Sequence, residues 1–495
     1  MSKPTALVIG AGVGGLATAI HLARRNFDVI VLEKNQKPGG RCNQITKDGH
    51  CFDTGPTFYI FPELYEAMFT ALGENINDHI KLIRIDPSHR IFFHDNSSIQ
   101  LTSDLALMRN QLEDFEPGSY SRFLSYLNKT QLYYEPVLRQ IITKDFSHPQ
   151  DYFNFGNLKL LLQAKGWQNH CSYLGKFFHD QRLKDAFVFQ DSYIGLNPHR
   201  TSSLFSIFSV SELTKGVWLP KGGMYQVVKA LLKIASKYGV KIRCGLPVEK
   251  IVTEGSRVKK IICGDGRSYT ADIVVANTDL AYTCRQLLPY DDFGKRINKK
   301  RFSCSTISFF WGLKKIYPAI KTHNIFLTKD SFDGYDRVIN KHLIPEKPHF
   351  YVHAPARTDL SLAPSGQDTI TAIIPVGHLT NASPKKWRAI KQKIRRYIFK
   401  RLYDIGITDF EKQIKFELSF SPVDWLNEYN LTHGATLGIH HDLLQMGYLR
   451  PGRRHPRYKN LYFTGSNTHP GSGVPTVLLS SHFTANAILS DSNYR

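Results

Sequence analysis

Residues 5–33, TALVIGAGVGGLATAIHLARRNFDVIVLE, determine how the rest of the chain is interpreted. The apolar run Ala6–Ile9 predicts a buried strand, the glycines of residues 10–15 predict a tight turn, and apolar residues at helical spacing follow. A second apolar run, Val29–Leu32, ends on Glu33, which lies 18 residues after the last glycine of the turn. A G-x-G-x-x-G turn inside a β-α-β unit, with an acid about 20 residues further on, is typical of dinucleotide-binding folds.

The residues of this turn have distinct tasks in such a fold. Gly10 allows the tight turn, Gly12 lets the backbone approach a pyrophosphate, and Gly15 lets the helix pack closely on the strand. Val13 and Gly14 begin the helix, whose free N–H groups and positive dipole end favour phosphate oxygens. We therefore predict that all five residues form a dinucleotide site.

Glu33 is expected to accept hydrogen bonds from the ribose hydroxyls of the adenosine half. Its carboxylate would repel a 2′-phosphate, so NADP is disfavoured. An apolar N-terminal segment could instead be a secretory signal peptide. That alternative fails because the glycine turn splits the apolar segment and no clear cleavage site follows it.

Two further segments decide between NAD and FAD. VLEKNQKPGGR at residues 31–41, followed by FDTGPT at residues 52–57, resembles the flavin-binding N-terminus of the bacterial-type phytoene desaturases, a family of carotenoid and retinoid oxidoreductases. NLYFTGSNTHPGSGVPTVLLSSHFTAN at residues 460–486 is similar to the C-terminal segment that closes over the flavin in that family. The resemblance covers nearly the whole chain and implies FAD as the cofactor.

The resemblance also implies further cofactor-binding residues at the positions of the family's motifs. They are Lys34, Gly40, Arg41, Gly55, Pro56, Thr57, Val248, Gly465, Gly473 and Val474. Val248 would place its backbone against the adenine. Free N–H groups at the start of the last helix, near Val474, can stabilise negative charge on the reduced flavin. An ordinary Gly/Pro-rich helix start is the alternative for this segment.

The residues do not identify a proton acceptor for the family's reaction, in which a flavin removes hydride from a saturated carbon and a proton leaves the neighbouring carbon. Asp424 and His469 are the candidates to test. Asp53 is as well suited to fixing the turn before Gly55 as to taking part. No Ser/His/Asp set or pair of carboxylates offers a rival catalysis.

The predicted fold class is α/β, with a Rossmann-like FAD-binding domain and an interleaved α+β substrate domain, as in glutathione-reductase-like and amine-oxidase-like flavoproteins. A chain of 495 residues is long enough for two or more domains, and no segment reads as a linker between them. We expect the FAD-binding domain to comprise residues 1–100, 216–285 and 440–495. Residues 101–215 and 286–439 are expected to form the substrate-binding, membrane-facing domain.

The chain carries a formal net charge of +22 and a pI near 9.5. Such a field favours an anionic partner, either nucleic acid or an acidic membrane surface. No nucleic-acid-binding module is recognisable, so a membrane surface is the better interpretation, with a generally basic proteome as the alternative. No run of about 18–20 apolar residues predicts a membrane span.

The cysteine and histidine patterns exclude two other classes of site. Seven cysteines at scattered spacing, without C-x-x-C, argue against a disulfide scaffold or a zinc site and favour a reduced, cytoplasmic chain. The 20 histidines show no metal-binding spacing. We therefore expect no metal.

The segment KKWRAIKQKIRRYIFKRLYDIGI at residues 385–407 predicts a basic helix with one apolar stripe. Such a helix can lie on an anionic membrane or pack on the substrate domain, and packing is favoured. Aromatic residues between 120 and 193 predict helical core, or alternatively the wall of a tunnel for a flat polyene.

These expectations combine into an FAD-dependent carotenoid desaturase that takes phytoene or a related polyene precursor. At about 0.8 kcal/mol per CH₂, transfer of a forty-carbon hydrocarbon through water costs tens of kcal/mol. The apolar polyene must therefore be drawn from a bilayer, and the protein should be cytoplasmic and peripherally associated with an anionic membrane. A carotenoid isomerase or polyene-end oxidase of the same family, a flavin amine oxidase, and a flavin-bearing lipid carrier are the alternatives.

Overall fold

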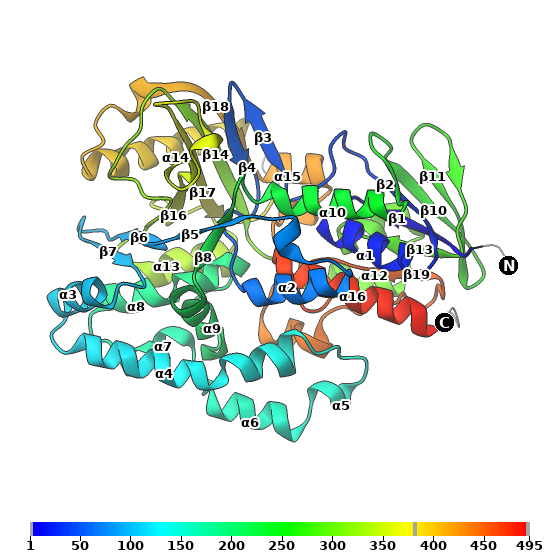
Figure 1. Cartoon of the computed structure of the whole chain (residues 1–495), viewed down its shortest axis with the longest axis horizontal. Coiled ribbons are helices and arrows are strands. Elements are labelled where there is room, and N and C mark those ends of the chain that lie inside the picture. Colours follow the sequence, from blue (N-terminus) through cyan, green and yellow to red (C-terminus); the bar gives the residue numbers. More distant parts are fainter. Residues whose placement is uncertain (1–2, 380–383, 492–495) are drawn as a thin grey trace.

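The computed structural model describes residues 3–379 and 384–491. One lobe holds both described ends of the chain, and the other carries a large, mostly antiparallel sheet above a group of helices (Figure 1). The first lobe is built on a parallel sheet in the order β19-β13-β1-β2-β9. Its strands are β1 (Thr5–Ile9), β2 (Asp28–Leu32), β9 (Lys241–Arg243), β13 (Ile273–Ala276) and β19 (Leu461–Phe463). The predicted β-α-β unit is thus present, with α1 (Val13–Ala23) as its helix.

Alternation of side chains along β1 explains why this sheet is buried on both faces. Ala6 and Val8 belong to the core beneath α1, α10 (Tyr225–Lys237) and α16 (Val474–Asp491). Leu7 and Ile9 point to the opposite core, beside β10 (Val248–Glu254), β11 (Arg257–Cys263) and β12 (Ser268–Tyr269). A parallel sheet covered on both faces requires such a continuous apolar strand.

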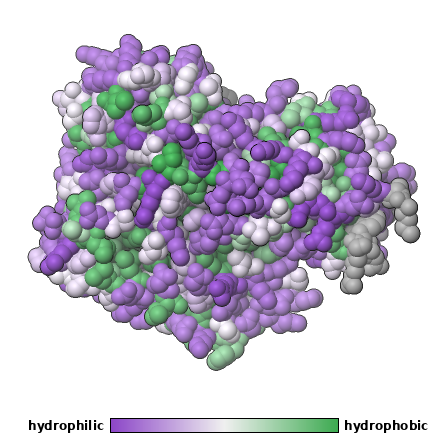
Figure 2. Space-filling view, viewed as in Figure 1, coloured by the Kyte–Doolittle hydropathy of each residue, from purple (hydrophilic) through white to green (hydrophobic). Residues whose placement is uncertain are grey.

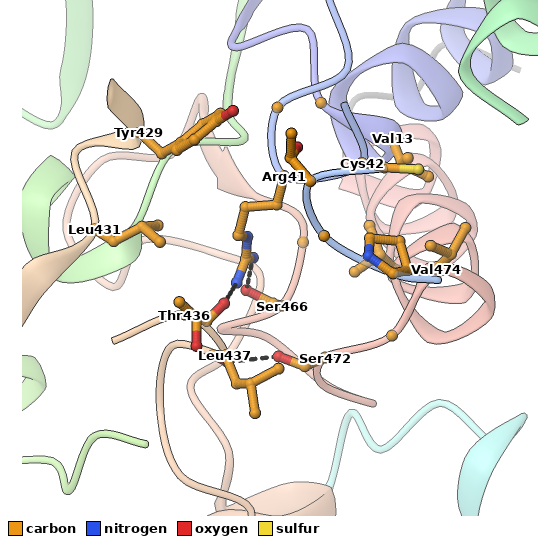
Figure 3. A pocket seen from close by; sticks show the side chains of 18 of the residues that line it. Val13, Arg41, Cys42, Tyr429, Leu431, Thr436, Leu437, Ser466, Ser472 and Val474 are labelled. Carbon is orange, nitrogen blue, oxygen red and sulfur yellow. Dashed lines mark hydrogen bonds between the residues drawn. The ribbon is translucent and has the colours of Figure 1, made fainter. Parts of the chain in front are cut away.

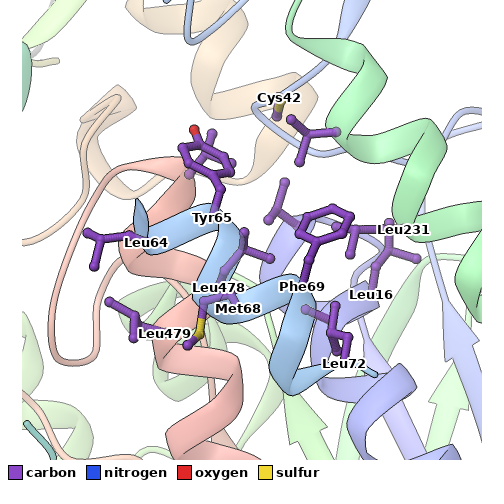
Figure 4. Packing of buried hydrophobic residues seen from close by; sticks show 14 of the residues in the cluster. Leu16, Cys42, Leu64, Tyr65, Met68, Phe69, Leu72, Leu231, Leu478 and Leu479 are labelled. Carbon is purple, nitrogen blue, oxygen red and sulfur yellow. The ribbon is translucent and has the colours of Figure 1, made fainter. Parts of the chain in front are cut away.

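The helix α2 (Pro62–Ala71) closes the first core. Its Leu64 and Met68 pack against α16, where Leu478 and Leu479 lie, and its Phe69 points toward α1 and α10 (Figure 4). Each large apolar side chain buried here contributes about 1.5–3 kcal/mol. Helix α16 is therefore held in place by a helix that follows the N-terminal motifs.

The second lobe contains a seven-stranded sheet in the order β18-β14-β17-β16-β15-β6-β7. The strands are β6 (His89–Phe92), β7 (Ser98–Leu101), β14 (Ser305–Leu313), β15 (His323–Phe326), β16 (Phe350–His353), β17 (Asp368–Val376) and β18 (Ile414–Phe420). Phe309 and Trp311 of β14 face the core under α14 (Pro384–Asp404). Thr306 and Ser308, on the other face, line a cavity.

Helix α14 is the basic segment predicted at residues 385–407. Its apolar stripe, which includes Ile394 and Ile398, is buried against the sheet. Arg395 lies 2.7 Å from both Glu411 and Glu417. The stripe that would enter a membrane is therefore used for packing. The side chain of Lys385 lies outside the described part of the chain.

Helices of different lengths fill the lower half of the second lobe (Figure 1). They are α3 (Leu105–Phe115), α4 (Ser119–Val137), α5 (Pro149–Tyr152), α6 (Phe155–Gln163), α7 (His170–Leu174), α8 (Gln181–Val188) and α9 (Ile207–Val210). The remaining elements are α11 (Leu280–Tyr282), α12 (Asp292–Asn298), α13 (Ser331–Tyr335), α15 (Pro422–Tyr429), and the hairpin β3 (Gln44–Lys47) and β4 (His50–Asp53). Strand β5 (Leu82–Ile85) pairs with β8 (Val217–Pro220).

One part of the expected domain division differs from the sheet topology. Residues 89–101 were predicted to lie in the FAD-binding domain, but β6 pairs in parallel with β15 and belongs to the seven-stranded sheet. Local sequence predicts a strand here but not its partner, which follows more than 200 residues later. We therefore propose that the first segment of the FAD-binding domain ends before β6.

Candidate functional site

A cavity of about 520 Å³ begins where the carboxyl ends of β1, β2 and β13 meet and continues beneath the seven-stranded sheet. Every residue predicted to bind the cofactor lines this cavity, with the exception of Gly15. The N-terminal loop, the segment at residues 54–57, Val248 and the start of α16 are thereby brought to one site. The fold decides this convergence because parallel strands place their carboxyl ends at one edge.

The glycine-rich turn exposes bare backbone to the cavity. A Cβ on Gly40 would meet Gly12 Cα at 3.2 Å, and a Cβ on Gly12 would meet Asn277 Oδ1 at 2.9 Å. Gly15 instead touches the strand, since a Cβ there would stand 2.0 Å from the Gly10 carbonyl oxygen. The loop therefore forms a cradle without side chains at the N-terminus of α1, which suits a pyrophosphate.

Glu33 is fixed at the end of β2. It is buried, its Oε2 accepts a hydrogen bond from Ala11 N at 2.7 Å, and its Oε1 accepts one from Asn35 N at 2.9 Å. Each carboxylate oxygen has a further lone pair, and the residue lines the cavity. The carboxylate is therefore held in place with lone pairs still free to accept hydroxyl groups, and its contact with a ribose stays a prediction.

Arg41 joins the two ends of the chain at the site. Its Nη1 donates to Thr436 O at 2.6 Å and its Nη2 donates to Ser466 Oγ (Figure 3). Burial lowers the pKa of Arg41, and the charge of Asp279 opposes that shift. The guanidinium supplies the positive charge beside the cradle that an anionic cofactor requires.

The sequence did not predict every residue of this half of the cavity. Asn277 contacts the glycine turn, and Tyr429, Leu431, Thr436 and Leu437 line the site from the loops after β18 (Figure 3). The sequence indicates a buried strand that ends at Asn277, and this strand end is the signal that could have identified Asn277 as a site residue. The loop at residues 429–437 carries no motif that would have revealed it.

None of the three candidate proton acceptors lines the cavity. Asp424 caps α15, where its Oδ2 accepts hydrogen bonds from Ser421 N and Oγ. His469 Nε2 lies 2.9 Å from Lys144 O, and burial lowers the pKa of His469 to about 3. Asp53 accepts a hydrogen bond from Met224 N at 2.8 Å, and burial raises the pKa of Asp53 to about 7. All three side chains instead make hydrogen bonds with the backbone.

The far half of the cavity is lined mostly by aliphatic and aromatic side chains. They include Phe58, Ile60, Phe61, Leu64, Ile142, Phe189, Tyr193, Phe208, Ile325, Leu327, Phe350 and Tyr351. Of the aromatic block expected between residues 120 and 193, Phe189 and Tyr193 reach this wall. Phe123, Phe178 and Phe187 lie in a separate core. The block is thus mainly core, as favoured, and the role of Phe189 and Tyr193 in a wall for a polyene stays a prediction.

The described residues show two absences that bear on the site. No group of three or more His, Cys, Asp or Glu side chains in residues 3–379 and 384–491 could hold a metal ion. Over the same ranges, no helix has the length and apolar character needed to cross a membrane.

Comparisons with known proteins agree with this geometry. Residues 13–289 match the family described as flavin containing amine oxidoreductase. The zeta-carotene-forming phytoene desaturase of Myxococcus xanthus is 37% identical over 485 residues, covering 98% of this chain and 93% of its own length. The 4,4′-diapophytoene desaturase (4,4′-diaponeurosporene-forming) of Staphylococcus aureus strain Newman is 32% identical, covering 98% of both.

Solved structures of flavin enzymes share the fold. Cyclohexylamine oxidase from Brevibacterium oxydans IH-35A superposes with a TM-score of 0.58 at 15% identity, over 99% of this chain and 100% of its own. At this level of identity the likeness concerns the fold alone. It bears out the predicted Rossmann-like flavoprotein architecture.

Proposed function

The chain belongs to the phytoene desaturase family of flavin-containing oxidoreductases, and we infer from this premise that it desaturates a polyene inside the cavity described above. It is an FAD-dependent carotenoid desaturase. The observation that carries the inference is a single cavity that joins the glycine cradle at the N-terminus of α1 to an apolar aromatic chamber. We propose phytoene or a closely related polyene precursor as the substrate.

Bound FAD supplies the acceptor for a hydride equivalent. The protein's residues bind and orient the cofactor: we propose that the cradle at Gly12 and Gly40 holds the pyrophosphate, Glu33 the ribose, and Arg41 the anionic edge. The chamber beyond Phe58 excludes water and aligns an extended hydrocarbon beneath the seven-stranded sheet. Apolar walls suit a substrate without polar groups, because they leave no polar atom unpaired on binding.

An anaerobic flavin-reduction assay tests this function. Purified holoprotein is mixed with phytoene in liposomes, and flavin absorbance and pigments are followed together. Loss of flavin absorbance with formation of a more unsaturated polyene is expected. Bleaching by amines but not by phytoene would identify an amine oxidase, and isomerised phytoene with oxidised flavin would identify an isomerase. Either outcome refutes desaturation.

We further propose that the protein collects its substrate at an anionic membrane, on its cytoplasmic side, through the helices α4–α6. Six large apolar side chains are exposed on and beside these helices: Leu132, Phe153, Phe155, Leu158, Leu162 and Trp167. We call them the apolar helical face. Figure 2 shows apolar side chains among polar ones in the lower part of the molecule, where Figure 1 places these helices. Unpaired cysteines fit the cytoplasmic side.

Exposed cations around the apolar helical face and its position beside the cavity support a lipid partner for this face. Lys129, Arg139, Lys159 and Lys165 are exposed around it, and each cation near an anionic surface contributes about 1 kcal/mol. Ile142, three residues after Arg139, lines the cavity. The face therefore lies next to one wall of the substrate chamber.

Vesicle flotation tests this surface. Replacing Phe155 and Trp167 together by Ser should weaken binding to anionic vesicles at least tenfold, since each buried aromatic contributes about 1.5–3 kcal/mol. Leu360→Ser, at a leucine 79% exposed elsewhere on the molecule, is the matched control. Equal binding of the double variant and the wild type would refute this location of the contact.

A further inference from the structure

A buried polar cluster adjoins the apolar chamber, where an apolar substrate offers it no hydrogen-bond partner. It consists of Glu212, Gln190, His89 and Tyr193. The side chains of His89 and Glu212 are fully buried, and Tyr193 lines the cavity. Burying a polar group without a partner costs about 1–3 kcal/mol, so packing alone favours apolar residues here.

The cluster is incompletely hydrogen-bonded. Gln190 Nε2 donates to Glu212 Oε2 at 3.1 Å. Glu212 Oε1 and Gln190 Oε1 have no hydrogen-bond partner among the described residues. Burial raises the pKa of Glu212 to about 7, because polar neighbours offset the loss of water only in part. A carboxyl group with such a pKa exchanges protons near neutral pH.

The contacts of His89 determine which of its nitrogens carries the hydrogen. Ser88 Oγ donates to Leu101 O at 3.1 Å, so its lone pairs face His89 Nδ1 at 3.2 Å. Glu212 Oε2, another acceptor, lies 3.8 Å from the same nitrogen. Nδ1 therefore carries the hydrogen, which leaves Nε2 to accept the Tyr193 hydroxyl at 3.0 Å. Burial lowers the pKa of His89 to about 3, so the ring is neutral.

The cluster meets the cavity beside a predicted cofactor residue. The ring of Tyr193 lies 4.5 Å from that of Phe58, which follows Thr57 in the chain. Tyr351 also lines the cavity, and its hydroxyl donates to Thr57 Oγ1 at 2.9 Å. Tyr193 therefore stands in the chamber on the side toward the cofactor cradle.

We propose that Tyr193, backed by His89 and Glu212, accepts the proton that the polyene loses during desaturation; this rests on the proposed function. Bound FAD would accept the hydride equivalent, and the substrate carbon that gives it up would be electron-poor, which would make the C–H bond of the neighbouring carbon acidic. That proton passes to the Tyr193 oxygen while the electron pair of the C–H bond becomes the new double bond.

Tyr193 and His89 each gain one proton and lose one, so the relay leaves one additional proton on Glu212. Tyr193 releases its hydroxyl hydrogen to His89 Nε2, and His89 releases its Nδ1 hydrogen to the Glu212 carboxylate. Because a positively charged His89 is disfavoured, the two proton transfers occur in one concerted step. The His89–Glu212 pair must approach by about 0.8 Å to reach a normal hydrogen bond, and such contacts commonly tighten when substrate binds. Tyr193 is the catalytic residue, and the other two act through it.

The first test compares flavin reduction by phytoene in Tyr193→Phe and Glu212→Gln with that in the wild type. General acid–base catalysis contributes about 10²–10⁴-fold, so both variants should be about 100-fold slower with unchanged flavin content and bound phytoene. The controls are Tyr133→Phe, a buried tyrosine bonded to Ser206 away from the cavity, and Asp185→Asn, a buried acid outside the cluster. Variants within threefold of the wild type refute the relay.

A second test uses only the wild-type protein. Phytoene has no titratable group, so the wild-type rate should rise through a pKa near 7 as Glu212 loses its proton. The other titratable groups of the cluster are Tyr193 and His89. Tyr351 and Tyr335 face Tyr193, and the ring of His323 lies 5.3 Å from that of His89; burial lowers the pKa of His323 well below its usual value. A rate independent of pH between 5.5 and 8.5 refutes the relay.

Infrared spectroscopy of the flavin-free protein gives an independent readout. The protonated-carboxyl band should weaken as pH rises through 7, and part of this change comes from Asp53, whose pKa is also about 7. The amplitude of the change should therefore be smaller in Glu212→Gln than in the wild type, and an equal amplitude in the two proteins overturns the assignment. A wild-type protein that phytoene does not reduce refutes the proposed function, whereas normal reduction in every variant refutes only the relay.

Discussion

The contact between Gly15 and Gly10 makes a sharp prediction about the cofactor cradle. A Cβ at residue 15 would stand 2.0 Å from the Gly10 carbonyl oxygen, whereas real Cβ contacts essentially never fall below 3.0 Å. The helix and strand must therefore separate by at least about 1 Å in Gly15→Ala. Relaxation is resisted because Gly10 N donates to Leu32 O at 2.7 Å.

The cost of such overpacking is about 1–3 kcal/mol. For domains of 150–250 residues, each kcal/mol lowers the melting midpoint by about 2–4 °C, so flavin-free Gly15→Ala should melt at least about 2 °C below the wild type. Gly15 does not line the cavity, yet FAD affinity should also fall because Gly10 and Gly12 move.

Calorimetry of the flavin-free protein, followed by FAD titration, measures both effects. Gly452→Ala is the matched control, since a Cβ there meets no atom within 4 Å, and its stability should stay within about 0.5 kcal/mol of the wild type. A Gly15→Ala protein with wild-type melting and wild-type FAD affinity would refute the packing argument.

Three further substitutions test other parts of the fold. Arg41→Met should raise the FAD dissociation constant at least tenfold in fluorescence titration, because hydrogen bonds to charged groups contribute about 1.5–3 kcal/mol; unchanged affinity would exclude Arg41 from the site. Asp53 has a folded-state pKa near 7 against an ordinary 3.8, so its contribution to stability declines as pH rises between these values. The melting temperature of Asp53→Asn should therefore rise relative to that of the wild type as the pH increases from 5 to 8. A difference in melting temperature that stays constant over this range would contradict the pKa shift. Ile398→Ala should cost about 2–5 kcal/mol in denaturant unfolding, whereas exposed Arg396→Gln should change little; equal effects would mean that α14 is not packed through its apolar stripe.

The cofactor half of the site could be predicted because its requirements are local. Gly10, Gly12 and Glu33 lie within one β-α-β unit, where turn geometry and strand direction fix their relative positions. The same holds for the start of α16, whose Gly473 opens a helix beside the cavity. In motifs of this kind, the residue type itself indicates the backbone geometry that the site requires.

The substrate half could not be predicted from the residues because its positions depend on distant pairings. β6 joins β15 across more than 200 residues, and this pairing brings His89 into the core beside the chamber. No pattern around Glu212 distinguishes a buried carboxyl group from an exposed one.

The amino-acid sequence by itself thus determined the Rossmann-like unit, the cofactor and the family, since glycines, strand ends and a single acid specify them within short segments. Only the tertiary structure decided that α14 buries its apolar stripe, that the exposed apolar side chains lie on α4–α6, and that Tyr193 connects the cavity to a buried carboxyl group. The physical reason is that burial and proximity are properties of long-range packing. The identity of an apolar or titratable residue does not reveal whether packing places its side chain in a core, on a surface or at the wall of a cavity.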